Sequence, residues 1–137
     1  MSDATELALR ALRHRDRSRR DLEDRLERAG IAEEERARAL DDLSAAGLLS
    51  DDRFAHERAK QLAKRNASNT LIRADLRRHG IDAEVVEEIV DGLESEAERA
   101  AGIFRQRGGG DRALRYLAGK GFARDSLDSL ADDDPVH

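Results

Sequence analysis

Three stretches of this chain share one pattern: LEDRLERAGI at residues 22–31, IRADLRRHGI at residues 72–81 and ALRYLAGKGF at residues 113–122. Each has an apolar or small residue, a leucine four positions later, a glycine four positions after that, and then an apolar residue. The copies are offset by 50 and then 41 residues, a period typical of proteins built from small helical repeats. One such unit is too small to bury its apolar face alone, so the pattern predicts units that stack in an array.

The glycine in each copy predicts where a helix ends. If Gly30 is the first residue past a helix, Leu26 and Ile31 have the spacing of the hydrophobic contact in a Schellman motif. Glycine suits this position because the left-handed backbone conformation costs it little. Gly80 and Gly121 repeat the arrangement, and Leu43, Gly47 and Leu48 give a fourth instance. We therefore expect a helix to end at each of these four glycines.

The apolar periodicity along the chain fits nine helices in three sets of three. Ser18, Ser50 and Ser95 are expected N-caps, because a serine hydroxyl accepts hydrogen bonds from the free amides of a helix start. The expected fold class is all-α, an elongated array of three tandem three-helix repeats. The repeats are assigned to residues 7–49, 50–94 and 95–131, between a disordered N-terminus at 1–6 and an acidic tail at 132–137.

The composition narrows the class of protein. Charged residues make up 40% of the 137 residues and aromatic residues 3%, so the cores must consist of Leu, Ile, Val and Ala. There is no cysteine, which excludes disulfides and thiolate metal sites. The sequence has neither the features of a signal peptide nor an apolar stretch long enough to span a membrane. We expect a soluble, cytoplasmic monomer.

Charge is segregated along the chain, although the net charge is −5. Seven basic residues oppose one acid between Arg58 and His79, and again between Arg99 and Arg124, whereas residues 82–98 carry only acidic charge. A basic stripe that recurs with the repeat suits a periodic polyanion or a protein filament. Because few aromatic rings are present for base stacking, any nucleic-acid contact should be to phosphates. The candidate filament- or DNA-binding residues are Arg58, Lys60, Lys64, Arg65, Arg73, Arg77, Arg78, Arg112 and Arg115.

No catalytic or metal-binding motif is complete. His56 and Glu57 resemble the start of a zinc-protease helix, but Lys60 stands where the second histidine belongs. Gly119 and Lys120 resemble the end of a phosphate-binding loop, but the next residue is a glycine instead of serine or threonine. We therefore expect neither an enzyme nor a bound metal or cofactor.

The stretch GLLSDDRFA at residues 47–55 resembles the signature of the RecX regulatory proteins, and the helix-end motifs on both sides resemble those of that family's units. The resemblance extends from about Leu7 to Leu130. It implies a modulator that lies in the groove of the RecA filament on single-stranded DNA. Such a modulator inhibits the ATPase, recombinase and coprotease activities of the filament, promotes filament shrinkage and needs no cofactor.

The matched block implies structural roles. Ser50 and Asp51 would start a helix, and Phe54 and Ala55 would pack between units. One departure lies at residues 66–69, where Asn-Ala-Ser-Asn stands in place of a glycine-rich turn. The residues assigned to the structural motif are Gly30, Gly47, Ser50, Asp51, Phe54, Ala55, Gly80 and Gly121.

Two other functions fit the sequence. Basic helix pairs could bind DNA directly and without sequence specificity, which predicts an affinity that falls steeply as salt rises. Alternatively, the stacked units could form a helical scaffold for another protein. Affinity that requires the recombinase would exclude the first alternative, and a different principal partner would support the second.

Overall fold

The computed structural model describes the backbone of residues 2–133 and the side chains of residues 2–130. Regular structure within residues 2–133 is entirely helical, which confirms the expected all-α array. The helices of this range are α1 (Asp3–His14), α2 (Arg19–Arg28), α3 (Glu33–Ala45), α4 (Asp51–Lys64), α5 (Asn69–Arg78), α6 (Ala83–Asp91), α7 (Glu96–Gln106), α8 (Gly110–Gly119) and α9 (Arg124–Asp133).

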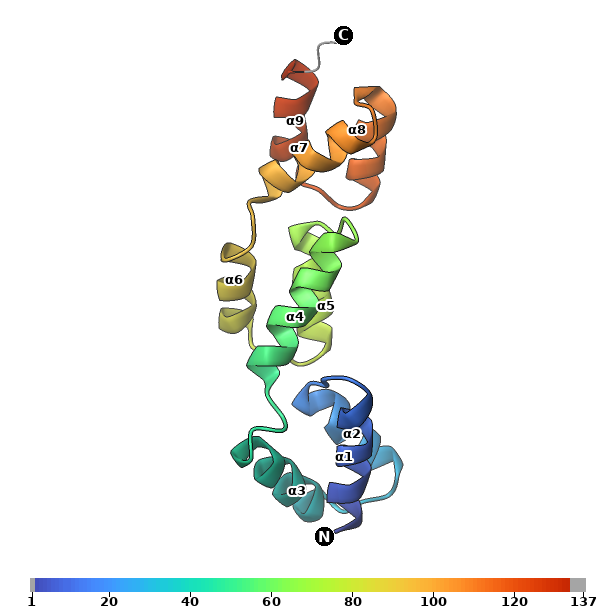
Figure 1. Ribbon diagram of the computed structural model, residues 1–137, viewed down its shortest axis with the longest axis vertical. Helices are drawn as coiled ribbons and strands as arrows, with labels where there is room; N and C mark the ends of the chain where they lie inside the picture. The colour runs from blue at the N-terminus through green and yellow to red at the C-terminus, as the bar shows by residue number, and fades with distance from the viewer. Residues whose placement is uncertain (1, 134–137) are drawn as a thin grey trace.

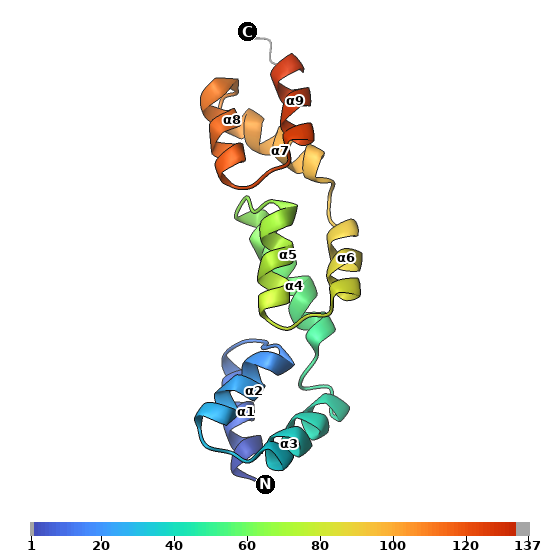
Figure 2. The same cartoon turned by 180° about the vertical axis from the view of Figure 1, so that it is seen from behind.

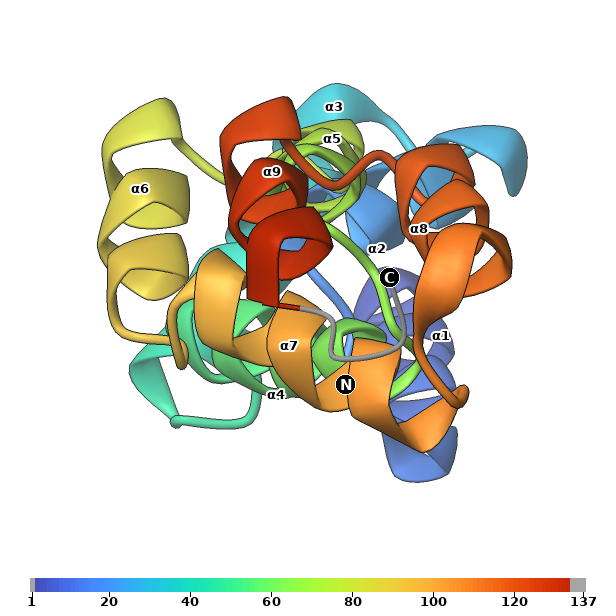
Figure 3. The same ribbon diagram turned by 90° about the horizontal axis from the view of Figure 1, so that it is seen from above.

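The helices form three successive groups along one long axis, with α1 near one end and α9 near the other (Figure 1). We call α1–α3 unit 1, α4–α6 unit 2 and α7–α9 unit 3. Helices pack extensively within each unit, and neighbouring units meet through fewer contacts at their ends. The view from behind in Figure 2 shows the same separation, and Figure 3, seen along the axis, shows the units stacked in a column. No helix within residues 2–133 is long and apolar enough to cross a membrane.

Each unit has an apolar core of its own, to which all three of its helices contribute. Leu26, Leu76 and Leu117 are the leucines that the three sequence copies share, and each is fully buried in the core of its unit. Burying one such side chain contributes roughly 1.5–3 kcal/mol. The repeated pattern therefore marks one fully buried leucine in each of three separate cores.

The glycine-ended helices close as the sequence predicts. At the end of α2 the amide of Ile31 donates to the carbonyl of Leu26 over 3.1 Å, and the amide of Gly30 donates to the carbonyl of Glu27 over 3.0 Å. Gly30 has a φ of +81°, the left-handed conformation that glycine adopts without a steric penalty. The same pair of hydrogen bonds closes the helices that end at Gly47, Gly80 and Gly121, which confirms all four Schellman ends.

Asn66 takes the place of a glycine at the end of α4. It is the one non-glycine residue of positive φ, +66°, among the described residues. The amides of Asn66 and Ala67 complete the same Schellman pair with the carbonyls of Ala63 and Leu62. Asparagine tolerates the left-handed conformation better than most side chains. Ser68 then caps α5, so the polar stretch 66–69 is a compact helix junction.

The expectation of a disordered N-terminus at residues 1–6 is wrong for residues 3–6, which form the first turns of α1. The Ser2 hydroxyl accepts a hydrogen bond from the Thr5 amide over 3.2 Å, and Ala4 is fully buried in the core of unit 1. A capped helix start with a buried residue is held in place. Within the expected acidic tail at 132–137, residues 132 and 133 belong to α9, and residues 134–137 lie outside the described residues.

Candidate binding groove between the second and third units

Some basic residues of the predicted run in α4 and α5 form ion pairs within unit 2. The Arg58 guanidinium donates from Nε and Nη2 to the two carboxylate oxygens of Asp75, each over 2.8 Å, and Arg78 adds a contact of 3.2 Å. The Asp75 side chain is 7% exposed. The hydrogen bonds from Arg58 hold the pKa of Asp75 below its ordinary value, although burial acts in the opposite direction. Arg58 therefore joins α4 to α5 inside unit 2.

The acidic third helix of unit 2 neutralises another member of the run. The Nε of Arg73 in α5 donates to the Glu87 carboxylate of α6 over 2.9 Å. Arg36 and Glu23 form a similar contact of 2.6 Å between α3 and α2 in unit 1. Charges that are segregated along the sequence are thus partly paired in space.

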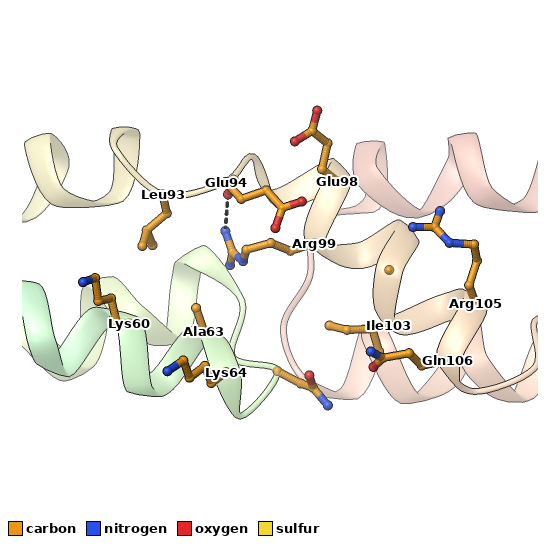
Figure 4. Close-up of a pocket in the computed structure, with 12 residues that line it drawn as sticks. Lys60, Ala63, Lys64, Leu93, Glu94, Glu98, Arg99, Ile103, Arg105 and Gln106 are labelled. Atoms are coloured by element: carbon orange, nitrogen blue, oxygen red, sulfur yellow. Dashed lines mark hydrogen bonds between the residues drawn. The ribbon is translucent and has the colours of Figure 1, made fainter.

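Lys60 and Lys64 lie on a groove where unit 2 meets unit 3. Figure 4 shows them projecting from α4, with Arg105 and Gln106 carried by α7. The groove has a volume of about 670 Å³. Lys60, Lys64 and Arg105 are exposed. The one ion pair described for these three cations is a long contact of 3.9 Å between Lys60 and Glu57. Three cations from two units are therefore accessible at this groove.

The groove is lined by both apolar and acidic side chains in addition to the cations. Ala63, Leu93 and Ile103 supply an apolar surface, and Glu94 and Glu98 place carboxylates on the rim next to α7. The two acids reduce the positive potential on that side. A partner with discrete anionic groups and some apolar surface fits this lining better than a uniformly charged polymer.

Arg99 lines the groove and joins the two units. Its guanidinium donates to Asn69 Oδ1 over 2.8 Å and to the carbonyls of Ala67 and Glu94 over 3.0 Å each. Burial lowers the pKa of Arg99 from its ordinary value, while Glu96 and Glu94 act to raise it. The guanidinium stays charged, since arginine does not lose its proton in proteins. The bonds to Asn69 and Ala67 join α7 to unit 2, so we assign Arg99 a structural role.

A cation and an aromatic ring extend the basic surface towards α8. Asn66, which also lines the groove, donates from its amide to the Tyr116 hydroxyl over 3.1 Å. The Arg107 guanidinium carbon lies 3.4 Å from the centre of the Tyr116 ring, and the Lys120 ammonium lies 5.7 Å from it. A guanidinium stacked on a ring in this way gains cation–π attraction.

The remaining predicted residues lie outside the groove. Arg65, Arg77, Arg112 and Arg115 are exposed and make no ion pair among the described side chains. The groove thus brings together two of the nine candidates, Lys60 and Lys64. Arg105 belongs to the third basic cluster but is not among the predicted residues, because its basic neighbours in the groove, Lys60 and Lys64, come from another unit.

The block at residues 47–55 contains the start of α4. The Ser50 hydroxyl accepts a hydrogen bond from the Arg53 amide over 3.1 Å and caps α4. Phe54 and Ala55, however, belong to the core of unit 2 and do not fill a core shared between units. Only Phe54 reaches the boundary, where it lines a small hollow together with Arg15 and Asp16 of unit 1. Each three-helix unit encloses its own core, which explains the difference.

The described residues contain no group of three or more histidine or acidic side chains placed to hold a metal ion. The groove presents exposed cations beside apolar side chains, which is the chemistry of a docking surface. Its two sides come from helices about 40 residues apart in sequence.

Comparison with known proteins gives consistent matches. The family profile described as "RecX, second three-helix domain" matches residues 50–89. The regulatory protein RecX of Acidithiobacillus ferrooxidans is 36% identical over 135 residues, which cover 92% of this chain and 87% of that protein. The regulatory protein RecX of Stenotrophomonas maltophilia is 31% identical and covers 93% of this chain and 85% of its own length.

Solved structures agree in fold. The crystal structure of RecX from Lactobacillus salivarius superposes with a TM-score of 0.78 at 21% identity, covering 95% of this chain and 93% of that one. A second crystal structure of a regulatory protein RecX gives a TM-score of 0.77 at 22% identity, covering 95% of this chain and 72% of that one. At this level of identity the likeness establishes the helical array.

Proposed function

This chain belongs to the RecX family of regulatory proteins, and we propose that it binds the RecA filament on single-stranded DNA and inhibits it. The activities affected are ATP hydrolysis, recombination and the coprotease function of the filament. The family resemblance of the sequence motivates this choice of partner. The protein acts by binding, with no cofactor and no catalytic step of its own.

The observation that carries the proposal is the set of exposed cations at the junction of units 2 and 3. Lys60 and Lys64 from one unit and Arg105 from the next line a single groove. An elongated array that carries cations at a junction between units suits a long, repetitive partner, because contacts spaced along the axis can be made at once. Arg65, Arg77, Arg112 and Arg115 are proposed as further contacts elsewhere on units 2 and 3.

Arg58, Arg73 and Arg78 have a different proposed role. Each is engaged with an acid of unit 2. A cation that is already paired gains less from a new anionic partner, so we propose that these three contribute less to binding than the unpaired cations.

Direct binding to DNA is the second candidate function. The stack of Arg107 on Tyr116 favours it, because guanidinium planes and aromatic rings are surfaces on which bases stack. The net charge of −5 and the two glutamates on the groove rim oppose it. Its signature would be affinity for DNA alone that falls steeply with salt.

A binding experiment separates the two candidates. The labelled protein is titrated with preformed RecA filaments on single-stranded DNA, and separately with the same DNA alone. The proposal predicts saturable binding to the filament and much weaker binding to the naked DNA at the same salt. Equal affinity for both would favour DNA binding, and no affinity for the filament would reject the proposed partner.

A further inference from the structure

The two junctions between units contain the same hydrogen bond. At the first junction the backbone amide of Arg19 donates to the Asp51 carboxylate over 2.7 Å. At the second junction the backbone amide of Asn69 donates to the Glu96 carboxylate over 2.8 Å. In both cases the donor is the first residue of a second helix, and the acceptor is the first residue of the following unit's first helix. The contact therefore recurs with the repeat.

A backbone contact recurs beside this hydrogen bond. At Gly80 an added Cβ would lie 2.7 Å from the Cβ of Arg20, and at Gly121 it would lie 2.9 Å from the Oγ of Ser68. Each glycine follows the second helix of one unit and touches the start of the second helix in the unit before it. α2, α5 and α8 consequently follow one another end to end along the column (Figure 2).

The acid at each junction satisfies a helix start that would otherwise be incomplete. The first amides of a helix have no partner within it and carry partial positive charge. Ser18 and Ser68, both 0% exposed, each accept one such amide of their own helix. The neighbouring unit supplies the acceptor for another. Since a hydrogen bond to an ionised acceptor is short and directional, it restrains the position of one unit against the next.

Glu96 accepts more hydrogen bonds than Asp51 does. Glu96 Oε1 also accepts from the Ala123 amide over 2.7 Å and from the Ser126 hydroxyl over 3.4 Å, so one carboxylate joins unit 2 to the start of α9. At the first junction two further contacts between side chains join units 1 and 2. His79 contacts Asp21 over 2.9 Å, and Arg53 contacts Asp16 over 3.2 Å.

We propose that Asp51 and Glu96 are positioning residues that fix the distance and angle between successive units. Through this restraint they also set the spacing at which the cations of the array meet a partner. The geometric part of the inference stands independently, whereas the last step rests on the proposed function. The groove itself depends on the restraint, because its two walls belong to units 2 and 3.

Unit 1 supplies an internal control. Its first helix begins with Ser2 and Asp3, as α4 begins with Ser50 and Asp51. No unit precedes it within the described residues, and Asp3 is exposed. Asp3→Ala removes an acid from the first turn of a helix without touching a junction. Any effect shared by Asp3→Ala and Glu96→Ala therefore comes from the helix dipole alone.

Distances between units provide the test. The chain has no cysteine, so spin labels can be attached to Glu34→Cys, Glu88→Cys and Ala118→Cys, exposed sites on α3, α6 and α8 that lie outside the hydrogen bonds of Asp51 and Glu96. Pulsed electron paramagnetic resonance on the full chain then measures the distance distribution across each junction. Glu96→Ala should broaden and shift the distribution between units 2 and 3 and leave that between units 1 and 2 unchanged. Asp51→Ala should do the reverse.

Glu96→Gln, which keeps an acceptor oxygen, should stay close to the parent distribution, and Asp3→Ala should match it. Circular dichroism establishes that each variant keeps its helices, and the unaffected junction shows that the array is intact. Unchanged distributions in both Glu96→Ala and Asp51→Ala would overturn the inference. If the distances change but filament inhibition does not, the link to function is overturned while the proposed function stands. A parent protein that fails to inhibit rejects the proposed function, and the distances still decide the geometric claim.

Discussion

Arg58 and Asp75 form a bidentate ion pair between α4 and α5, with two hydrogen bonds of 2.8 Å each. The Asp75 side chain is 7% exposed and that of Arg58 27% exposed, so the pair is largely removed from water. Both charges are satisfied by hydrogen bonds, which is the condition under which a buried pair is tolerated. Arg58, although it belongs to the densest basic run of the sequence, therefore holds α4 and α5 together within unit 2.

Removing the acid from this pair should destabilise the protein. Asp75→Ala leaves the Arg58 guanidinium partly buried without its partner, which costs about 3 kcal/mol in the free energy of unfolding. Urea unfolding followed by circular dichroism measures the loss. The double variant Arg58→Met with Asp75→Leu should recover much of it, because no unpaired charge remains. A single variant as stable as the parent protein would show that the pair is not formed in solution.

The lowered pKa of Asp75 predicts a dependence of stability on pH. The folded state favours the carboxylate, so this contribution is fully present above the ordinary aspartate pKa, about 4, and disappears as the pH falls through the lowered pKa of the folded state. Asp75→Asn carries no titrating group at this position. Its free energy of unfolding should fall less than that of the parent protein between about pH 6 and pH 3. Parallel pH curves for the two proteins would contradict the assignment.

The parts of the structure that sequence analysis predicted depend on neighbouring residues. A glycine four positions after a buried leucine predicts a helix end because the Schellman bonds lie within six residues, as at Leu26 and Ile31. The partners of Arg58 and Arg73 are 17 and 14 residues away on other helices, so the pattern of charge along the chain did not reveal them. The start of α1 depends on the burial of Ala4 against another helix, which the first residues alone do not indicate.

The candidate site was predicted less completely for the same reason. Lys60 and Lys64 stand out as part of a basic run, but Arg105 joins them only because α4 and α7 line the same groove. The hydrogen bond that Asp51 accepts from unit 1 could not be predicted from the sequence either. A first-turn acid is common in helices, and its bond to Arg19 becomes visible only when two units are stacked.

Gly80 and Gly30 provide a matched pair for testing the contact between units. Both have a φ of +81°, but an added Cβ would meet Arg20 only at Gly80, whereas nothing lies within 4 Å at Gly30. Gly30→Ala should cost about 1 kcal/mol through the left-handed conformation alone. Gly80→Ala should cost more, because Arg20 must also move. Urea midpoints measure both, and equal losses would show that units 1 and 2 do not approach as closely as described.

Reversing charge at the groove should weaken binding to the filament. The variant with Lys60→Glu and Lys64→Glu changes two exposed cations on one wall and should lower the affinity about tenfold, or about 1.4 kcal/mol. The matched control, Arg10→Glu with Arg25→Glu, makes the same change of charge at exposed sites of unit 1. Its affinity should stay close to that of the parent protein. Equal losses in both variants would indicate a general effect of net charge instead of a site.

The most direct test of the central claim is the hydrolysis of ATP by the cognate RecA on single-stranded DNA, measured while this protein is titrated in. The account predicts inhibition that sets in well below one molecule per RecA subunit and is weakened by the Lys60→Glu and Lys64→Glu variant but not by the Arg10→Glu and Arg25→Glu control. An unchanged rate of hydrolysis at stoichiometric concentrations of the folded protein would contradict it.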